Sequence, residues 1–309
     1  MKDTNMAAKQ LSGVVVPVIT PVDEEDRVDE AAFRKVLRRL IESGVHVLFV
    51  GGSAGEGPLF PLSEWVRLME IAHDEVGEAL PLLGGVMETS SKRIADKLKI
   101  LSLIGYEHYV VTPAYYFPLK TTDEHLRLFG DCKAHDRGMN MIPYNLPGIV
   151  KAEIPVEVLV DMTRRGWVRY CKESSANLDY FRRLVTEGRE VGLQVFMGDE
   201  LSMRDGLKLG ACGIVPSCAN FEAQPFIDAY DAALAGDDEA LNAAYQRILV
   251  LRDNLPLAGS YWVAGVKQAL ASIGIGSGKP VSPMSLLTIE QQEKIKAFVY
   301  ESMAVHGAH

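Results

Sequence analysis

Short apolar runs alternate with longer segments of helical spacing along most of this 309-residue chain. The runs are rich in β-branched residues and cover 14–20, 45–52, 80–86, 108–112, 139–144, 168–172, 193–197 and 212–216. Continuous apolar strands that are separated by helices are typical of a parallel sheet with both faces buried. Since open doubly wound sheets usually have about six strands, eight runs favour a closed (β/α)8 barrel, the TIM barrel.

The segments between the runs carry helix signals. The apolar residues of 64–77 fall on one face of a helix. Thr121 and Glu124 stand at the spacing of a capping box, which predicts a helix that begins there. His125, on that helix, is expected at the surface.

From about residue 222 onward the strand signal stops. The remaining sequence has helical spacing, in stretches such as EALNAAYQRILVLRDNL and IEQQEKIKAFVYESM. We therefore expect a barrel domain over 1–221 and a C-terminal helical domain over 222–309. Because no Ser-, Pro- or Gly-rich linker separates them, the helical domain should pack against the barrel.

The composition is typical of a globular protein, with 48% hydrophobic and 24% charged residues. A net charge of −9 without a Lys/Arg-rich run argues against nucleic acid or an anionic membrane as a partner. No apolar run approaches the roughly 18 residues of a membrane span, and the first residues show no secretory signal. The four cysteines form no CxxC pair and have no histidine at metal-ligand spacing. We expect a cytoplasmic protein without a metal.

Tyr144 and Lys172 end the fifth and the sixth apolar runs. In a barrel, the carboxyl ends of neighbouring strands meet at one mouth, where active sites gather. A lysine at the tip of a buried strand is poorly solvated, which favours the neutral amine. A neutral amine can attack a carbonyl carbon to form a Schiff base, and a nearby phenol can move the protons that this requires. The alternative is an ordinary lysine that extends its charge to water beside a core tyrosine.

A glycine-rich segment, GGSAGEGPLF, follows the second run at 51–60. Such a strand-to-helix turn lets backbone N–H groups approach an anion, and Ser53 adds a hydroxyl. A nucleotide site is disfavoured, because neither GxxxxGK(S/T) nor a second glycine fingerprint with a ribose-binding acid is present. The spacing suits a carboxylate better, and a turn without any ligand is the alternative.

Several ordered motifs stand at characteristic spacing along the chain. They are GxxGE after the second run, YNLPG at the fifth, CKESS at the sixth, and also GVVVPVITPV, VVTPAYYFP, GDELSMRDGLKLGACGIVPSCAN and VKQAL. Together they resemble the superfamily of dihydrodipicolinate synthase and N-acetylneuraminate lyase, over nearly the whole chain. The resemblance implies class I aldolase chemistry through a lysine Schiff base, without a cofactor. It also implies a homotetramer built as a dimer of tight dimers.

The resemblance gives roles to residues at the barrel mouth. Lys172 matches the Schiff-base lysine, and Tyr144 matches the tyrosine that moves protons to and from the substrate. Ser53 and Ala54 match the paired residues that hold the carboxylate of a 2-oxo acid such as pyruvate. Ser53 keeps the usual hydroxyl, whereas Ala54 offers its backbone N–H.

Three further residues have counterparts in the family. Tyr115 matches the tyrosine that some members send into the site of a neighbouring subunit, and the adjacent Tyr116 stays an alternative. Gly198 and Val215 match residues that shape the pocket of the lysine.

Departures from the synthase pattern concern the substrate. The synthases carry an arginine five residues after the tyrosine for the second substrate, and Ile149 stands there. A charged hydrogen bond contributes ~1.5–3 kcal/mol, so its loss is not a small change. Ser174 resembles the residue that contacts the hydroxylated tail in the lyases, and Glu200 and Ser217 match polar positions that grip the sugar-acid chain. The resemblance therefore favours a sugar-derived 2-oxo acid over aspartate semialdehyde.

The expected activity is pyruvate-dependent cleavage or condensation of a 2-keto-3-deoxy sugar acid or a sialic-acid-like substrate. The alternatives are 4-hydroxy-tetrahydrodipicolinate synthase, a 2-keto-3-deoxy sugar-acid dehydratase and a protein that binds 2-oxo acids without turnover. Lys172 and Tyr144 are common to the enzymes of the family, so they cannot choose among these. Lys151, where the family usually has glycine, either supplies positive charge to the site or is a solvated loop lysine.

Overall fold

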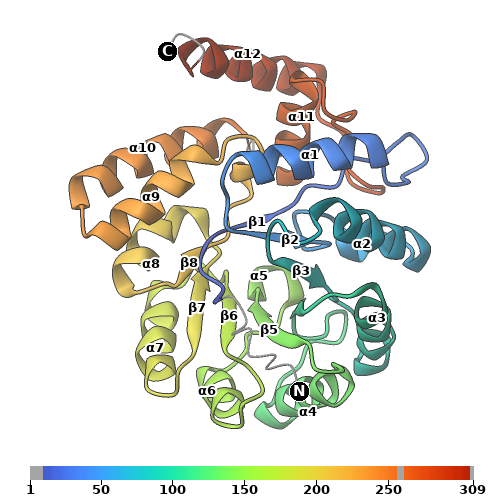
Figure 1. The fold of residues 1–309 in the computed structure, drawn as a ribbon, viewed down its shortest axis with the longest axis vertical. Coiled ribbons are helices and arrows are strands. Elements are labelled where there is room, and N and C mark those ends of the chain that lie inside the picture. The colour runs from blue at the N-terminus through green and yellow to red at the C-terminus, as the bar shows by residue number, and fades with distance from the viewer. Residues whose placement is uncertain (1–9, 256–260, 307–309) are drawn as a thin grey trace, which may run out of the picture.

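Eight parallel strands close into a barrel in sequence order (Figure 1). The computed structural model describes residues 10–255 and 261–306. The strands are β1 (Gly13–Pro17), β2 (Val47–Val50), β3 (Leu82–Gly85), β4 (His108–Val111), β5 (Asn140–Asn145), β6 (Tyr170–Glu173), β7 (Gln194–Met197) and β8 (Gly213–Ile214). β1 pairs with both β2 and β8, which closes the ring. The predicted (β/α)8 barrel is confirmed, and each predicted run overlaps one strand.

Helices follow the strands and surround the barrel (Figure 1). They are α1 (Glu30–Glu42), α2 (Leu62–Val76), α3 (Ser91–Ile104), α4 (Thr122–His135), α6 (Val156–Arg164), α7 (Leu178–Arg189), α8 (Met203–Leu209) and α9 (Gln224–Ala235). Shorter elements follow the carboxyl ends of four strands: η1 (Gly57–Leu59), α5 (Pro147–Val150), η2 (Glu200–Ser202) and η3 (Cys218–Asn220). α9 packs against β1 and β8, so it completes the ring of helices.

The start of α4 is fixed by the predicted capping box. Thr121 Oγ1 accepts from Glu124 N at 3.2 Å, and Glu124 Oε2 accepts from Thr121 N at 3.0 Å. The expectation that His125 lies at the surface is wrong, because its exposed fraction is 2%. His125 shares a helix face with Phe129 and Cys132, four and seven residues later, and that face packs on the barrel.

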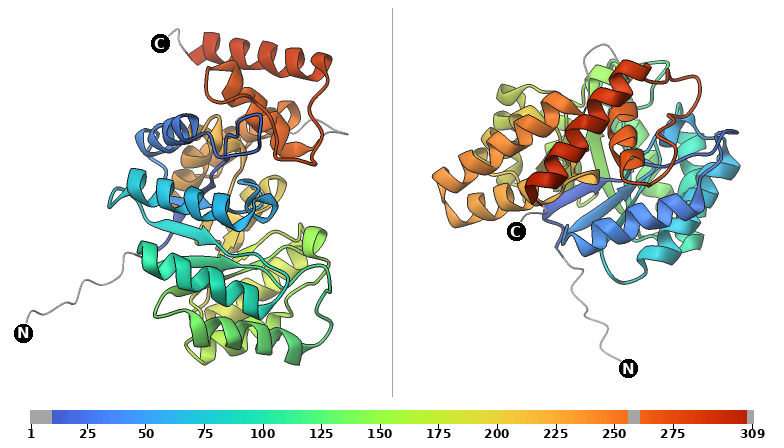
Figure 2. Two further views of the ribbon diagram at one scale, coloured as in Figure 1. Left: turned by 90° about the vertical axis from the view of Figure 1, so that its right-hand side faces the viewer. Right: turned by 90° about the horizontal axis from the view of Figure 1, so that it is seen from above.

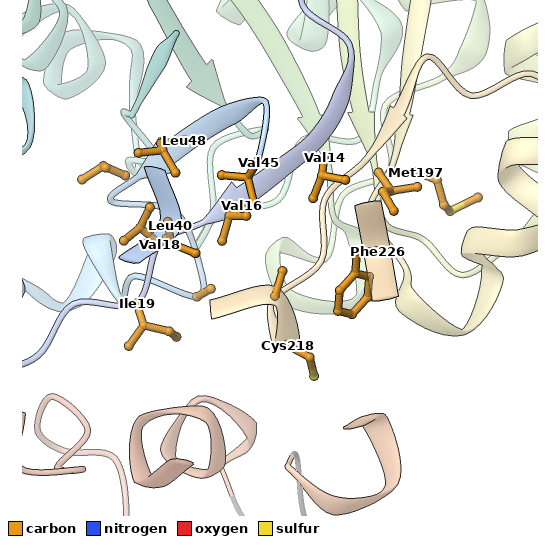
Figure 3. Packing of buried hydrophobic residues seen from close by; sticks show 14 of the residues in the cluster. Val14, Val16, Val18, Ile19, Leu40, Val45, Leu48, Met197, Cys218 and Phe226 are labelled. Carbon is orange, nitrogen blue, oxygen red and sulfur yellow. The ribbon is translucent and has the colours of Figure 1, made fainter. Parts of the chain in front are cut away.

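Strand side chains alternate between two buried layers, because successive residues of a strand point to opposite faces of the sheet. In β1, Val14 and Val16 belong to the outer layer under the helices, whereas Val15 points into the barrel. Leu40 and Phe226 pack in the outer layer (Figure 3). The inner layer comprises Leu11, Val15, Val47, Phe49, Leu83, Met87, Val110, Ile142, Tyr144, Leu146, Tyr170, Phe196 and Val215. Since these side chains fill the barrel interior, we expect the active site at the mouth, where the carboxyl ends of the strands meet.

Beyond α9 the chain forms three further helices, here called the C-terminal helices: α10 (Asp238–Asn254), α11 (Trp262–Ser272) and α12 (Ile289–His306). α10 packs against α9, while α11 packs against η3 and α12. α11 and α12 form a layer at one end of the molecule, next to α1 (Figure 2). Ile295 and Val299 of α12 join the outer buried layer of the barrel, so the two parts share one core. The predicted division into a barrel domain over 1–221 and a helical domain over 222–309 stays a prediction. α9 comes after residue 221 in the chain, and it packs against β1 and β8 of the barrel.

None of the helices described over 10–255 and 261–306 is long and apolar enough to cross a membrane. Within the same ranges, no group of three or more His, Cys, Asp and Glu side chains is arranged to hold a metal ion. Residues 1–9, on which the expectation about a secretory signal depends, lie outside the described residues.

Candidate active site

Lys172 and Tyr144 lie directly opposite each other in the ladder between β6 and β5. Their exposed fractions are 7% and 4%. Lys172 Nζ lies 4.0 Å from the centroid of the Tyr144 ring and 5.2 Å from that of Phe49 on β2. The predicted meeting of the two strand ends is confirmed, and the amine is buried beside two aromatic rings. Phe49, the aromatic residue of the otherwise aliphatic strand β2, was not among the predicted site residues.

The loop after β2 reaches Lys172 through Phe49. A Cβ added at Gly52 would lie 2.6 Å from the Phe49 ring, so the loop backbone rests directly on that ring. Ser53 is half-buried and Ala54 is buried. The loop therefore brings a hydroxyl and backbone N–H groups to the mouth, and these are donors that a carboxylate requires.

The end of β7 packs closely against the lysine strand at Gly198. A Cβ added there would lie 2.0 Å from Ser174 Oγ and 3.0 Å from Lys172 Cε. Ser174 Oγ is buried and has no hydrogen-bond partner among the described residues. Because buried hydroxyl groups are normally hydrogen-bonded, this one is available to a molecule bound at Lys172.

Glu200 and Ser217 bind each other. Glu200 Oε1 accepts from Ser217 N at 2.5 Å, from Ser217 Oγ at 2.8 Å and from Cys218 N at 2.9 Å. Glu200 Oε2 forms an ion pair with Arg252 Nε of α10 at 3.3 Å. Protein donors thus occupy the Glu200 carboxylate, and the Ser217 oxygen keeps its capacity to accept. Val215 is buried in the inner layer, where it can shape the pocket.

Tyr115 and Tyr116 point in different directions. Tyr115 is half-buried and packs against the inner layer, and burial raises the pKa of its phenol. Tyr116 is 80% exposed, has a φ of 74°, and its ring meets the exposed Phe117 edge-on at 5.0 Å. Tyr115 therefore belongs to the mouth of its own chain, whereas Tyr116 is presented outward.

The departures from the synthase pattern lie on and after α5. Ile149 is 57% exposed and offers no charge. Lys151 is exposed, and its Nζ donates to Gly148 O at 2.6 Å. The Lys151 amine therefore caps α5, which favours an ordinary surface role for it.

A buried pair behind the mouth was missed by the sequence analysis. Asn145 and Glu173 directly follow Tyr144 and Lys172, and Asn145 Nδ2 donates to Glu173 Oε1 at 3.2 Å. Ser175 N donates to the same oxygen at 2.6 Å. Burial raises the pKa of Glu173, whose exposed fraction is 0%. The available signal was an acidic residue directly after the sixth apolar run, and it is the last residue of β6.

The closed barrel defines the structural class of the protein: a (β/α)8 barrel with a lysine–tyrosine contact at the carboxyl ends of β5 and β6. The chain belongs to the Dihydrodipicolinate synthetase family, whose sequence model matches residues 10–302.

Individual relatives cover nearly the whole chain. A DapA-like lyase of Halobacterium salinarum, itself uncharacterized, is 28% identical over 93% of this chain and 92% of its own. The 4-hydroxy-tetrahydrodipicolinate synthase of Ralstonia nicotianae is 24% identical, with coverages of 95% and 98%. That of Methylobacterium radiotolerans is 29% identical, with coverages of 88% and 89%. The structure of dihydrodipicolinate synthase from Bacteroides thetaiotaomicron has a TM-score of 0.89 at 23% identity, over 94% of this chain and 98% of its own. At that identity the structural likeness shows the shared fold.

Proposed function

We propose that the protein is a class I aldolase-type lyase that forms a Schiff base between Lys172 and a 2-oxo acid such as pyruvate. The observation that carries the proposal is the buried contact of 4.0 Å between Lys172 Nζ and the Tyr144 ring. A poorly solvated amine beside a phenol supplies both a nucleophile and a proton carrier.

In the proposed mechanism, the Lys172 amine attacks C2 of the 2-oxo acid, and the carbinolamine loses water to give an iminium. Tyr144 passes protons between the amine, the C2 oxygen and the substrate hydroxyl. In the cleavage direction, loss of the proton from the C4 hydroxyl breaks the C3–C4 bond. The electron pair enters the iminium to give an enamine, and an aldehyde leaves. Protonation at C3 and hydrolysis then release pyruvate and restore the amine.

The carboxylate of the 2-oxo acid binds, in this proposal, to the Ser53 hydroxyl and the backbone N–H of Ala54. The close approach of Gly52 to Phe49 supports this, because the same ring faces Lys172. A carboxylate held there would place its adjacent carbonyl carbon next to the amine, and such positioning can supply much of a rate enhancement.

The proposed substrate is a sugar-derived 2-oxo acid. Ser174 supports this, since its buried hydroxyl lacks a partner among the residues described. Ser217 would accept from a substrate hydroxyl, while Glu200 holds Ser217 in place. Ile149 supports it as well, because the mouth then lacks the guanidinium that would bind a second carboxylate at that position.

The second candidate is 4-hydroxy-tetrahydrodipicolinate synthase, the activity that the Ralstonia and Methylobacterium relatives are named for. Ile149 argues against it. A sugar-acid dehydratase would use the same iminium and differ in which bond breaks, so product analysis separates it. A binding protein would form the imine without turnover.

Borohydride reduction in the presence of pyruvate, followed by intact mass and peptide mapping, tests the proposal. We expect one reduced pyruvate adduct, on Lys172, and no adduct in Lys172→Met. Lys151→Met is the matched control, because it removes a surface lysine from the same face and should label as the unmodified protein does. An unlabelled protein with every 2-oxo acid would contradict the proposal. A screen of 2-keto-3-deoxy sugar acids, with aldehyde release and dehydration read separately, then identifies the reaction.

A homotetramer and a cytoplasmic location belong to the same proposal. The exposed aromatic rings of Tyr116 and Phe117 support a surface that a second copy covers. Assembly varies within this fold, since one structural neighbour is described as a monomeric dihydrodipicolinate synthase variant. Free thiols at Cys132, Cys171, Cys212 and Cys218 support a reducing compartment.

A further inference from the structure

The loop after β2 is tied to the C-terminal helices by a buried ion pair. Glu56 and Lys267 are 1% and 3% exposed, and Glu56 Oε2 contacts Lys267 Nζ. Glu56 Oε1 accepts from Val281 N at 3.0 Å, and the Tyr261 side chain hydrogen-bonds to the same carboxylate. Lys267 Nζ also donates to Lys279 O at 3.0 Å. These partners of the Glu56 carboxylate all come from α11 and the segments that flank it.

Glu56 is joined directly to the proposed carboxylate site. Its N–H donates to Ser53 O at 3.2 Å, and its backbone is left-handed with a φ of 57°. A residue with a side chain persists in that conformation only where its surroundings hold it. The next residue cannot absorb a movement, because a Cβ at Gly57 would lie 2.0 Å from Gly51 O. A displacement of the Glu56 side chain is therefore transmitted toward Ser53.

The other end of the ion pair is fixed to the barrel. Lys279 Nζ pairs with Asp26 Oδ1 at 3.1 Å and donates to Glu24 O at 2.7 Å. The segment between α11 and α12 thus lies along the connection between β1 and α1. The segment that binds the Lys267 amine is therefore itself bound to the barrel, which fixes the position of the amine beside Glu56.

We propose that Lys267 is a positioning residue, which holds the Ser53–Ala54 turn through Glu56 in the geometry that binds the carboxylate of the 2-oxo acid. The inference rests on the proposed function. Removal of one partner of a buried ion pair leaves an uncompensated charge, which must move or change its protonation state. The loss of Lys267 therefore displaces Glu56 and the turn, while Lys172 and Tyr144 keep their own contacts. Carboxylate binding should weaken more than imine chemistry slows.

The test measures the rate of borohydride trapping of Lys172 against pyruvate concentration, which gives a half-saturating concentration and a limiting rate. In Lys267→Met we expect the half-saturating concentration to rise about tenfold or more, with a limiting rate within about threefold of the unmodified protein. The double variant Glu56→Gln, Lys267→Met should recover most of the loss, because the buried side chain is then neutral and keeps an acceptor for Val281 N. Lys208→Met, which breaks the surface pair of Lys208 and Asp238, is the matched control and should change neither quantity.

A purely structural ion pair gives a different result. A lower melting temperature in Lys267→Met with an unchanged half-saturating concentration overturns the proposal. If Lys267→Met does not fold, the same measurement is made on Tyr261→Phe. This variant removes one hydrogen bond to Glu56 and should raise the half-saturating pyruvate concentration about threefold. An unchanged value in Tyr261→Phe then overturns the proposal. Failure of the unmodified protein to label at Lys172 would instead overturn the proposed function.

Discussion

Gly198 leaves no room for a side chain. A larger residue there would displace Ser174 or Lys172 of the candidate site. An added Cβ would lie 2.0 Å from Ser174 Oγ and 3.0 Å from both Lys172 Cε and Glu173 O. The ends of β6 and β7 therefore pack closely at the lysine, and Tyr144 of β5 lies beside the same amine. Such close packing makes the amine sensitive to small changes of volume.

Gly198→Ala tests this sensitivity. We expect borohydride trapping of Lys172 with pyruvate to slow about tenfold or more, because the methyl group moves the lysine stem from its productive position. Gly148→Ala on α5 is the control, since nothing lies within 4 Å of its added Cβ. Equal trapping rates in the two variants would show that the contact at Gly198 is not limiting.

Glu173 is a second residue whose environment makes a prediction. Its pKa is raised from 4.5, chiefly because the carboxyl group is buried. The folded protein thus holds this proton more tightly than the unfolded chain does. The stability that this gives is complete below the unfolded pKa and is lost as the pH rises toward the raised folded pKa.

Glu173→Gln removes that titration and keeps an acceptor for Asn145 and Ser175. The melting temperature of the variant relative to the unmodified protein should therefore be more favourable at about pH 8 than at about pH 5. Calorimetry at the two pH values checks this. A difference that does not depend on pH would contradict the assignment of a raised pKa to Glu173.

At the scale of single elements, α4 shows how far local sequence rules reach. The capping box of Thr121 and Glu124 was predicted from spacing alone, because its bonds join residues three apart. The burial of His125 was not predicted, although the spacing to Leu128, Phe129 and Cys132 was the available signal. The position of His125 on the helix face, and not the polarity of its side chain, decides its burial.

Thr121→Ala should destabilise the protein by about 1 kcal/mol, because Glu124 N then loses its acceptor at the first turn. Urea unfolding measures the change. Thr122→Ala, at the first helical residue, is the matched control and should have a smaller effect. If both substitutions cost the same, the hydrogen bond seen at Thr121 does not stabilise the helix.

At the scale of the whole molecule, the loop between β4 and α4 carries aromatic side chains in two different environments. Tyr115 packs into the mouth of its own barrel, whereas Tyr116 and Phe117 are 80% and 78% exposed. Exposed aromatic side chains are enriched at protein interfaces. The proposed assembly therefore uses Tyr116 and Phe117 as contacts with a second copy.

Light scattering tests the assembly. We expect a tetramer for the unmodified protein and a smaller species for the double variant Tyr116→Asp, Phe117→Asp, because buried charges at an interface are costly. Leu234→Asp, at a 70% exposed leucine of α9, is the control and should leave the mass unchanged. A fully active monomer would remove any role for a tyrosine from a neighbouring subunit.

The sequence by itself determined the eight strands, the helices between them and the approach of Lys172 to Tyr144. Apolar periodicity is local, and barrel closure in chain order then makes the fifth and sixth strands neighbours. Only the tertiary structure decided which partners the other polar groups have. Glu56 forms an ion pair with Lys267, which lies far along the chain. The Glu200 carboxylate binds Ser217 and Arg252. The buried Ser174 hydroxyl has no hydrogen-bond partner among the described residues. These pairings depend on which loops the closed barrel and the C-terminal helices bring together, and no local pattern encodes that.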